Sequence, residues 1–114
     1  MEGASGYIRA MSEERDELRW DVVRELRRMF ARGASVGDLI LFIQTSLGLG
    51  KDQRLFVFRY LAESFKVPLP VLLRIGGWEG FEEGTQTDKD IEEIIRPAIV
   101  AAEREWMNDS APTD

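Results

Sequence analysis

The sequence predicts a single all-α domain of about five helices. Apolar residues recur every three or four positions along most of the chain, capping residues precede these segments, and no alternation is long enough to build a sheet. The 114 residues are enough to bury one compact core. We expect residues 1–11 to form an N-terminal arm, residues 12–107 the helical domain and residues 108–114 a flexible tail.

The first helix is predicted over residues 12–32. Ser12 can cap it, acidic residues fill its opening turn and arginines its end, which suits the helix dipole, and Gly33 can stop it. Trp20 falls on a charged face, where an arginine, the N-terminal arm or a partner could cover it. The apolar stripe consists of Leu18, Val22, Leu26, Met29 and Phe30.

The next two helices are predicted over residues 36–47 and 52–65. Ser35 and Asp38 resemble a capping box, with aspartate in the place usually taken by glutamate. Residues 39–43 are apolar on every side and could also form a buried strand, but the cap before them and the glycine after them favour a short central helix. Asp52 is the expected cap of the helix that follows.

Two further helices are predicted over residues 70–76 and 88–107. Proline is tolerated in a first helical turn, so Pro70 can open the short one. Thr87 and Asp90 offer a second capping box, and Pro97 should kink the last helix near its middle or divide it. Its buried face should carry Ile91, Ile94, Ile95, Ala98, Ile99, Ala102 and Trp106.

Several chemistries are excluded because the chain contains no cysteine and no histidine. There can be no disulfide, no thiolate nucleophile, and no zinc or iron–sulfur site built on those ligands. The usual catalytic triad is also excluded. We therefore expect a protein that is not an enzyme and holds no cofactor and no metal.

Negative charge is concentrated in the last third of the chain. The whole chain has a formal charge of -6, and residues 76–114 alone carry eleven acidic and three basic side chains. This balance disfavours nucleic acid and anionic membranes as partners. No stretch approaches the roughly 20 apolar residues that cross a bilayer, and no signal peptide is recognisable, so we expect a cytoplasmic protein.

The candidate binding site lies within this acidic third. Trp78 and Phe81 stand among glycines and glutamates, and aromatic anchors ringed by charge are typical of protein interfaces. The alternative is that both rings fold back onto the core. The spacing of the acids does not fit a calcium-binding loop. The predicted partner-binding residues are Trp78, Glu79, Phe81, Glu82, Glu83, Asp88, Asp90, Glu92 and Glu93.

These features predict a non-catalytic module that binds a basic protein partner through its acidic third. In general character the chain resembles small bacterial inhibitors and immunity proteins, a likeness of type that carries no site residues. One alternative is a self-associating scaffold that uses residues 39–43 and exposed aromatics. Another is a DNA-binding regulator with a helix-turn-helix over residues 38–65, although the second helix of that motif looks too apolar to read bases.

Overall fold

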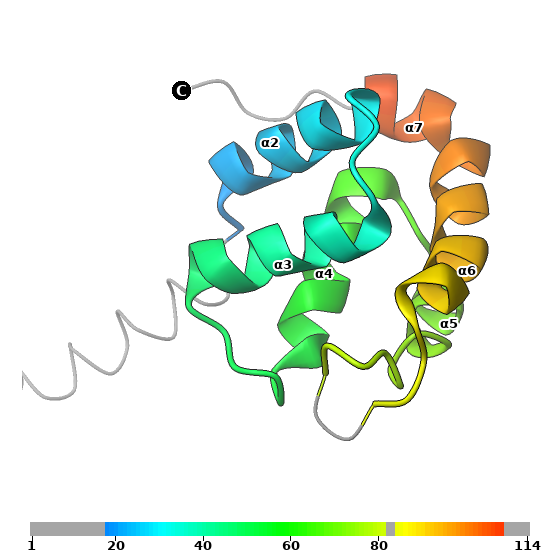
Figure 1. Ribbon diagram of the computed structural model, residues 1–114. Helices are drawn as coiled ribbons and strands as arrows, with labels where there is room; N and C mark the ends of the chain where they lie inside the picture. The colour runs from blue at the N-terminus through cyan, green and yellow to red at the C-terminus, as the bar shows by residue number, and fades with distance from the viewer. Residues whose placement is uncertain (1–17, 82–83, 109–114) are drawn as a thin grey trace, which may run out of the picture.

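The computed structural model describes residues 18–81 and 84–108 and confirms an all-α single domain (Figure 1). In this part of the chain the only strand-like feature is one isolated bridge between Trp78 and Gln86. None of its helices is both long and apolar enough to cross a bilayer. The helices are α2 (Trp20–Ala31), α3 (Val36–Leu47), α4 (Arg54–Phe65), α5 (Leu69–Leu73), α6 (Asp88–Ala101) and α7 (Glu103–Asn108).

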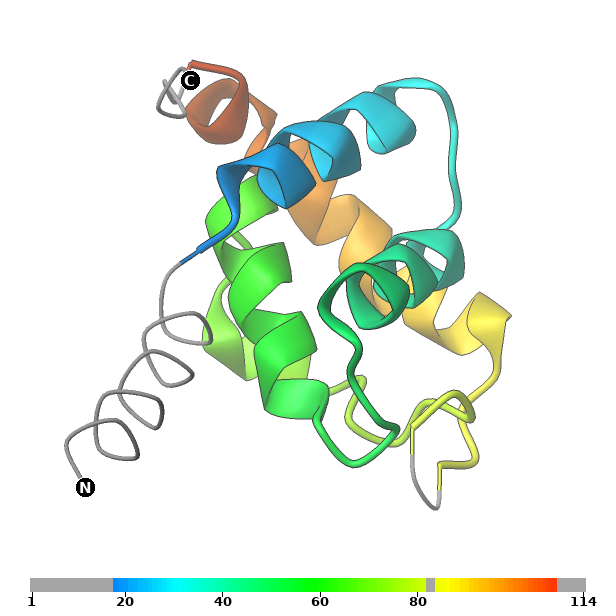
Figure 2. The same cartoon turned by 90° about the vertical axis from the view of Figure 1, so that its left-hand side faces the viewer.

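The helices surround one apolar core. Helix α3 packs against α6, which passes behind it in Figure 2, and α2 packs against α4. The short α7 turns back over α4 at the end of α2. The largest fully buried side chains include Leu26, Leu39, Ile40, Ile43, Tyr60, Leu61, Phe65, Leu72, Ile75, Phe81, Ile91 and Ile95.

Helix α2 begins later than predicted, at Trp20, because Arg19 is extended. The backbone N–H of Arg19 donates to the Tyr60 hydroxyl at 2.8 Å, and its guanidinium donates to the Ser46 carbonyl at 2.9 Å. These contacts attach the residue before α2 to helices α3 and α4. The prediction of one continuous helix over residues 12–32 is therefore wrong. The proposed cap Ser12 and the N-terminal arm lie outside the described residues. Trp20 is half-buried against the core.

Helix α3 has the predicted bounds. Ser35 and Asp38 form the capping box, and Gly48 ends the helix in the left-handed conformation at φ 65°, which glycine adopts without strain. The strand alternative for residues 39–43 is therefore wrong. Most of that apolar run is buried inside the protein, and only Leu41 is largely exposed, at 52%.

Helix α4 starts two residues after the predicted boundary. Its N-cap is Gln53, not Asp52, and the Gln53 side chain accepts a 2.8 Å hydrogen bond from the N–H of Gly50. The helix ends at Lys66, a non-glycine residue at φ 56°. The next helix, α5, spans five residues instead of the predicted residues 70–76.

The last predicted helix is divided, but at Ala102 and not at Pro97, which α6 contains in its interior. The break lets Trp106 fold back, where its ring packs edge-on against Phe30 and Phe65 at 6.0 and 5.2 Å. Its indole N–H donates to the Ile99 carbonyl at 2.9 Å. That carbonyl is one of the last four of α6, which have no partner within their own helix.

Candidate protein-binding surface

The two aromatic residues of the predicted binding loop are buried. Trp78 is 4% exposed and Phe81 2%. Their rings meet edge to face at 5.3 Å, and Phe81 meets Phe58 in the same way at 6.0 Å. Burying a large aromatic ring lowers the free energy of the folded state more than keeping that ring exposed on a short loop would. The prediction that Trp78 and Phe81 anchor a partner is therefore wrong, and the core alternative is right.

The loop is closed around Trp78. The indole N–H donates to Asp88 at 2.7 Å, and the Gly77 carbonyl accepts hydrogen bonds from the N–H groups of Thr85 and Gln86. A Cβ on Gly84 would overlap the Trp78 carbonyl, so only glycine fits there. The glycines in this segment thus allow the backbone to wrap a tryptophan.

The acids at the start of α6 stabilise the fold. Asp90 accepts a 2.9 Å hydrogen bond from the N–H of Thr87, which completes the second capping box as predicted. Asp88 holds Trp78 and also lies close to Gly37 at the start of α3. Carboxylates in a first turn interact favourably with the helix dipole. Both side chains are exposed, but both already have a role within the protein.

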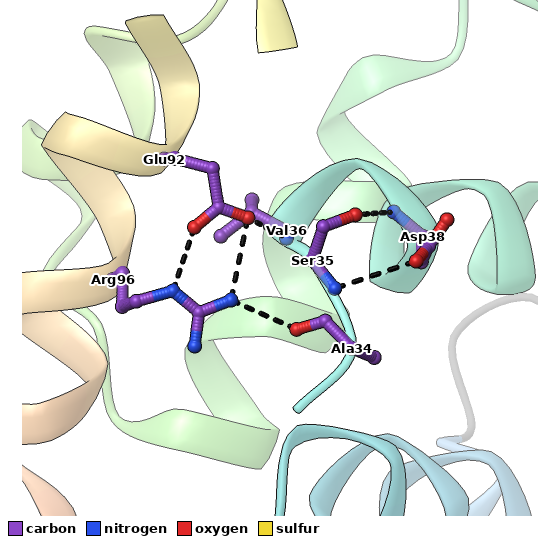
Figure 3. Close-up of polar contacts among 6 residues, drawn as sticks. All are labelled: Ala34, Ser35, Val36, Asp38, Glu92 and Arg96. Carbon is purple, nitrogen blue, oxygen red and sulfur yellow. Dashed lines mark hydrogen bonds and ion pairs between the residues drawn. The ribbon is translucent and has the colours of Figure 1, made fainter. Parts of the chain in front are cut away.

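Glu92 belongs to a polar clamp between α6 and the α2–α3 connection (Figure 3). Its carboxylate accepts from the N–H of Val36, the first residue of α3, and from the Arg96 guanidinium at 2.6 Å. Arg96 donates in turn to the Ala34 carbonyl at 2.8 Å. Figure 3 shows both α6 side chains directed toward this connection. Glu92 therefore already has partners within the protein.

Arg96 is held on three sides. Besides Glu92 and Ala34, its guanidinium carbon lies 4.9 Å from the centre of the Phe30 ring. The hydrogen bond to Glu92, which outweighs partial desolvation, raises the pKa of Arg96 above its ordinary value. The positive charge of Arg96 is thus committed to the clamp.

Two of the predicted partner-binding acids have side chains that are free as well as exposed. Glu79 and Glu93 form no ion pair with any residue in ranges 18–81 and 84–108. Glu82 and Glu83 lie outside the described residues. The structure therefore separates the predicted set into a buried aromatic pair, three acids with internal partners and two acids that face solvent freely.

The outer face of α6 and α7 was not predicted as part of the site. Val100 and Met107 are 52% and 63% exposed, and two shallow hollows adjoin along this face. Val100, Ala101 and Met107 fall outside the periodic apolar stripe that fills the core. Their position off this stripe was the one sequence signal that could have indicated an exposed apolar face. The lining residues are Glu92, Glu93, Arg96, Pro97, Val100 and Ala101 of one hollow, and Val100, Ala101, Glu103, Arg104, Met107 and Asn108 of the other.

The acidic side chains that the structure describes on this surface do not form a metal-binding cluster. Over the described residues, no three side chains of the acidic, cysteine or histidine type converge as metal ligands would. A hard cation needs several oxygen ligands around one point. The free carboxylates and exposed aliphatic groups of α6 and α7 instead suit contact with a protein.

Comparisons with family models, curated proteins and solved structures found no match for this chain.

Proposed function

We propose that this protein is a small acidic module that binds a basic protein partner through its C-terminal third. In its sharpest form it is an inhibitor or immunity-type protein that covers a cationic active site, such as that of a nuclease toxin. A surface rich in carboxylates can imitate the phosphates that such a site binds. No catalytic role is proposed.

The observation that carries the proposal is the concentration of negative charge in the last third of the chain. Residues 76–114 carry a net charge of -8, while residues 35–75 carry five basic and three acidic side chains. Within the acidic third, Glu79, Glu93, Glu103 and Glu105 are exposed. Exposed charges of one sign speed the encounter with an oppositely charged partner.

Affinity capture on the immobilised full-length chain, followed by mass spectrometry, identifies the partner, and association rates are then measured at two salt concentrations. The charge-reversed variant is Glu79→Lys, Glu82→Lys and Glu83→Lys together. We expect its association rate to fall roughly tenfold and to lose most of its salt dependence, since steering depends on these charges.

The matched control is Asp52→Lys, which reverses an exposed charge outside the acidic third. It should leave the association rate within about twofold. An unchanged rate for the triple variant, or an equal effect of the control, contradicts docking through the acidic third.

Self-association remains the second candidate. The predicted contact through residues 39–43 is wrong for most of that run, which is buried, but other exposed side chains favour association. Leu55, Leu69 and Leu73 of α4 and α5 are 69%, 55% and 57% exposed. Exposed apolar groups of this size are frequent in contacts between subunits. Sedimentation decides between the candidates, because a monomer at high micromolar concentration excludes a stable assembly.

DNA binding has less support. The second helix of the proposed helix-turn-helix, α4, buries Val57, Phe58, Tyr60, Leu61 and Phe65. Recognition helices present a polar face to the base edges, and α4 leaves few polar groups for that task. A gel shift on mixed genomic fragments tests this alternative.

A further inference from the structure

The outer face of α6 and α7 combines exposed apolar groups with unpaired negative charge. The two hollows share Val100 and Ala101 in their linings, so they adjoin, and we call the two together the furrow. Pro97 contributes a ring at one side, and Met107 reaches the other end at 63% exposure. The furrow therefore offers an apolar floor that nothing in the described part of the chain covers.

Pro97 also leaves one backbone carbonyl of α6 without its usual helical donor. Proline has no N–H, so Pro97 cannot donate to the carbonyl four residues before it, that of Glu93. The side chain of the same residue is exposed. Glu93 thus presents a carboxylate and a carbonyl without its usual helical donor at the edge of the furrow.

The charges around the furrow indicate which charge its ligand should carry. The two hollows are lined by three acidic side chains, Glu92, Glu93 and Glu103, and by two basic ones, Arg96 and Arg104. One of those cations, Arg96, is committed to Glu92, Ala34 and the Phe30 ring. Exposed Glu93 and Glu103 flank the apolar groups, with Arg104 as the exposed cation near the far end. A positively charged ligand with one apolar side complements this pattern.

We infer that the furrow along α6 and α7 receives an amphipathic helix with basic flanks from the partner protein. The helix places its apolar side on Pro97, Val100 and Met107 and its lysine or arginine side chains beside Glu93 and Glu103. Helices dock in this manner when anchors recur every three or four residues along one face. The inference rests on the proposed function and specifies which surface of the acidic third makes the contact.

The test uses a fluorescein-labelled helical peptide of leucine and lysine with one apolar face, and fluorescence anisotropy against the full-length protein. A peptide of the same composition in scrambled order measures attraction by charge alone. Val100→Ser should weaken binding of the amphipathic peptide at least about fivefold, because an apolar anchor is lost. Glu93→Gln should weaken it about threefold or more, and more at low salt than at high salt.

Two matched control variants change residues outside the furrow. Leu55→Ser removes an exposed apolar side chain of α4, and Asp52→Asn removes an exposed charge just before α4. Neither should change the affinity by more than about twofold. Circular dichroism and thermal unfolding of every variant verify that the fold is retained.

Each other outcome overturns the inference. Equal binding of the scrambled peptide means attraction by charge alone, and no binding of either peptide means that no helix seats there. A dimer in sedimentation that Val100→Ser dissociates identifies a second copy of this chain as the occupant. The proposed function fails separately, when charge reversal at Glu79, Glu82 and Glu83 leaves partner association unchanged.

Discussion

The indole nitrogen of Trp78 and the carboxylate of Asp88 are joined by a hydrogen bond of 2.7 Å. This contact ties the glycine-rich loop to the first turn of α6. Both residues were predicted to bind a partner, but the indole donor and the carboxylate acceptor bind each other. The proposed docking surface therefore consists of other groups of the same acidic third.

Replacing Trp78 tests whether the loop is a structural element. Trp78→Phe removes the indole donor and part of a buried ring, and it should lower the free energy of unfolding by about 2–3 kcal/mol. Asp88→Asn keeps an acceptor oxygen and should cost less than about 1 kcal/mol. Urea denaturation measures both, and a neutral Trp78→Phe would show that the ring does not support the fold.

Gly84 should be intolerant of any side chain. Gly84→Ala places a methyl group against the Trp78 carbonyl and should cost about 2 kcal/mol or more, since backbone must move. Gly77→Ala is the matched control, because a Cβ there meets the Gln86 side chain at 3.4 Å. The midpoint temperature of thermal unfolding should be much lower for Gly84→Ala than for Gly77→Ala. The reverse order would contradict a loop that wraps Trp78.

Neighbouring glutamates of α6 should differ in their effect on stability. Glu92→Ala removes contacts to Val36 and Arg96 and should cost about 1–2 kcal/mol, a moderate value because the pair is partly exposed. Glu93→Ala should change stability by less than about 0.5 kcal/mol. Equal costs in urea denaturation would mean that the clamp shown in Figure 3 contributes nothing specific.

The C-cap of α4 should be improved by glycine. Lys66 has φ 56°, a conformation that costs an L-residue roughly 1 kcal/mol and glycine almost nothing. Both Lys66→Gly and Lys66→Ala lose the lysine contacts. The difference between their free energies of unfolding therefore measures the backbone strain alone. Lys66→Gly should be more stable than Lys66→Ala by about 1 kcal/mol, and equal midpoints in denaturant would refute this strain.

Asp21 should make stability depend on pH in the acid range. The hydrogen bond from Arg19 holds the pKa of Asp21 below its ordinary value of 3.8. A carboxyl whose pKa is lower in the folded state stabilises the protein above its unfolded pKa and loses that effect as pH falls through the folded pKa. NMR titration should place this pKa below 3.8 in the wild type and closer to it in Arg19→Ala.

The parts of the fold that sequence predicted well are those set by local rules. The capping boxes at Ser35 and Thr87 depend on residues three apart, and both helices begin where those pairs indicate. Long-range contacts caused the errors. Arg19 is held extended by Tyr60 and Ser46. The break at Ala102 goes with the return of Trp106 to the core, where it donates to the Ile99 carbonyl. Nothing near these residues in sequence reveals such partners.

The candidate site was less predictable for a related reason. Composition located the excess charge, but it could not show which carboxylates already had partners. Glu92 and Glu93 are adjacent, yet the helical rotation between them directs one to Arg96 and the other to solvent. The exposed Val100 and Met107 became a candidate surface only once the buried face of α6 was known.

The most direct test of the account is the hydrogen-exchange footprint of the protein bound to its captured partner. If the acidic third is the docking surface, binding should slow exchange at residues 76–108 and leave α2 and α4 unchanged. Protection confined to α2 and α4, with no change along α6 and α7, would contradict the account.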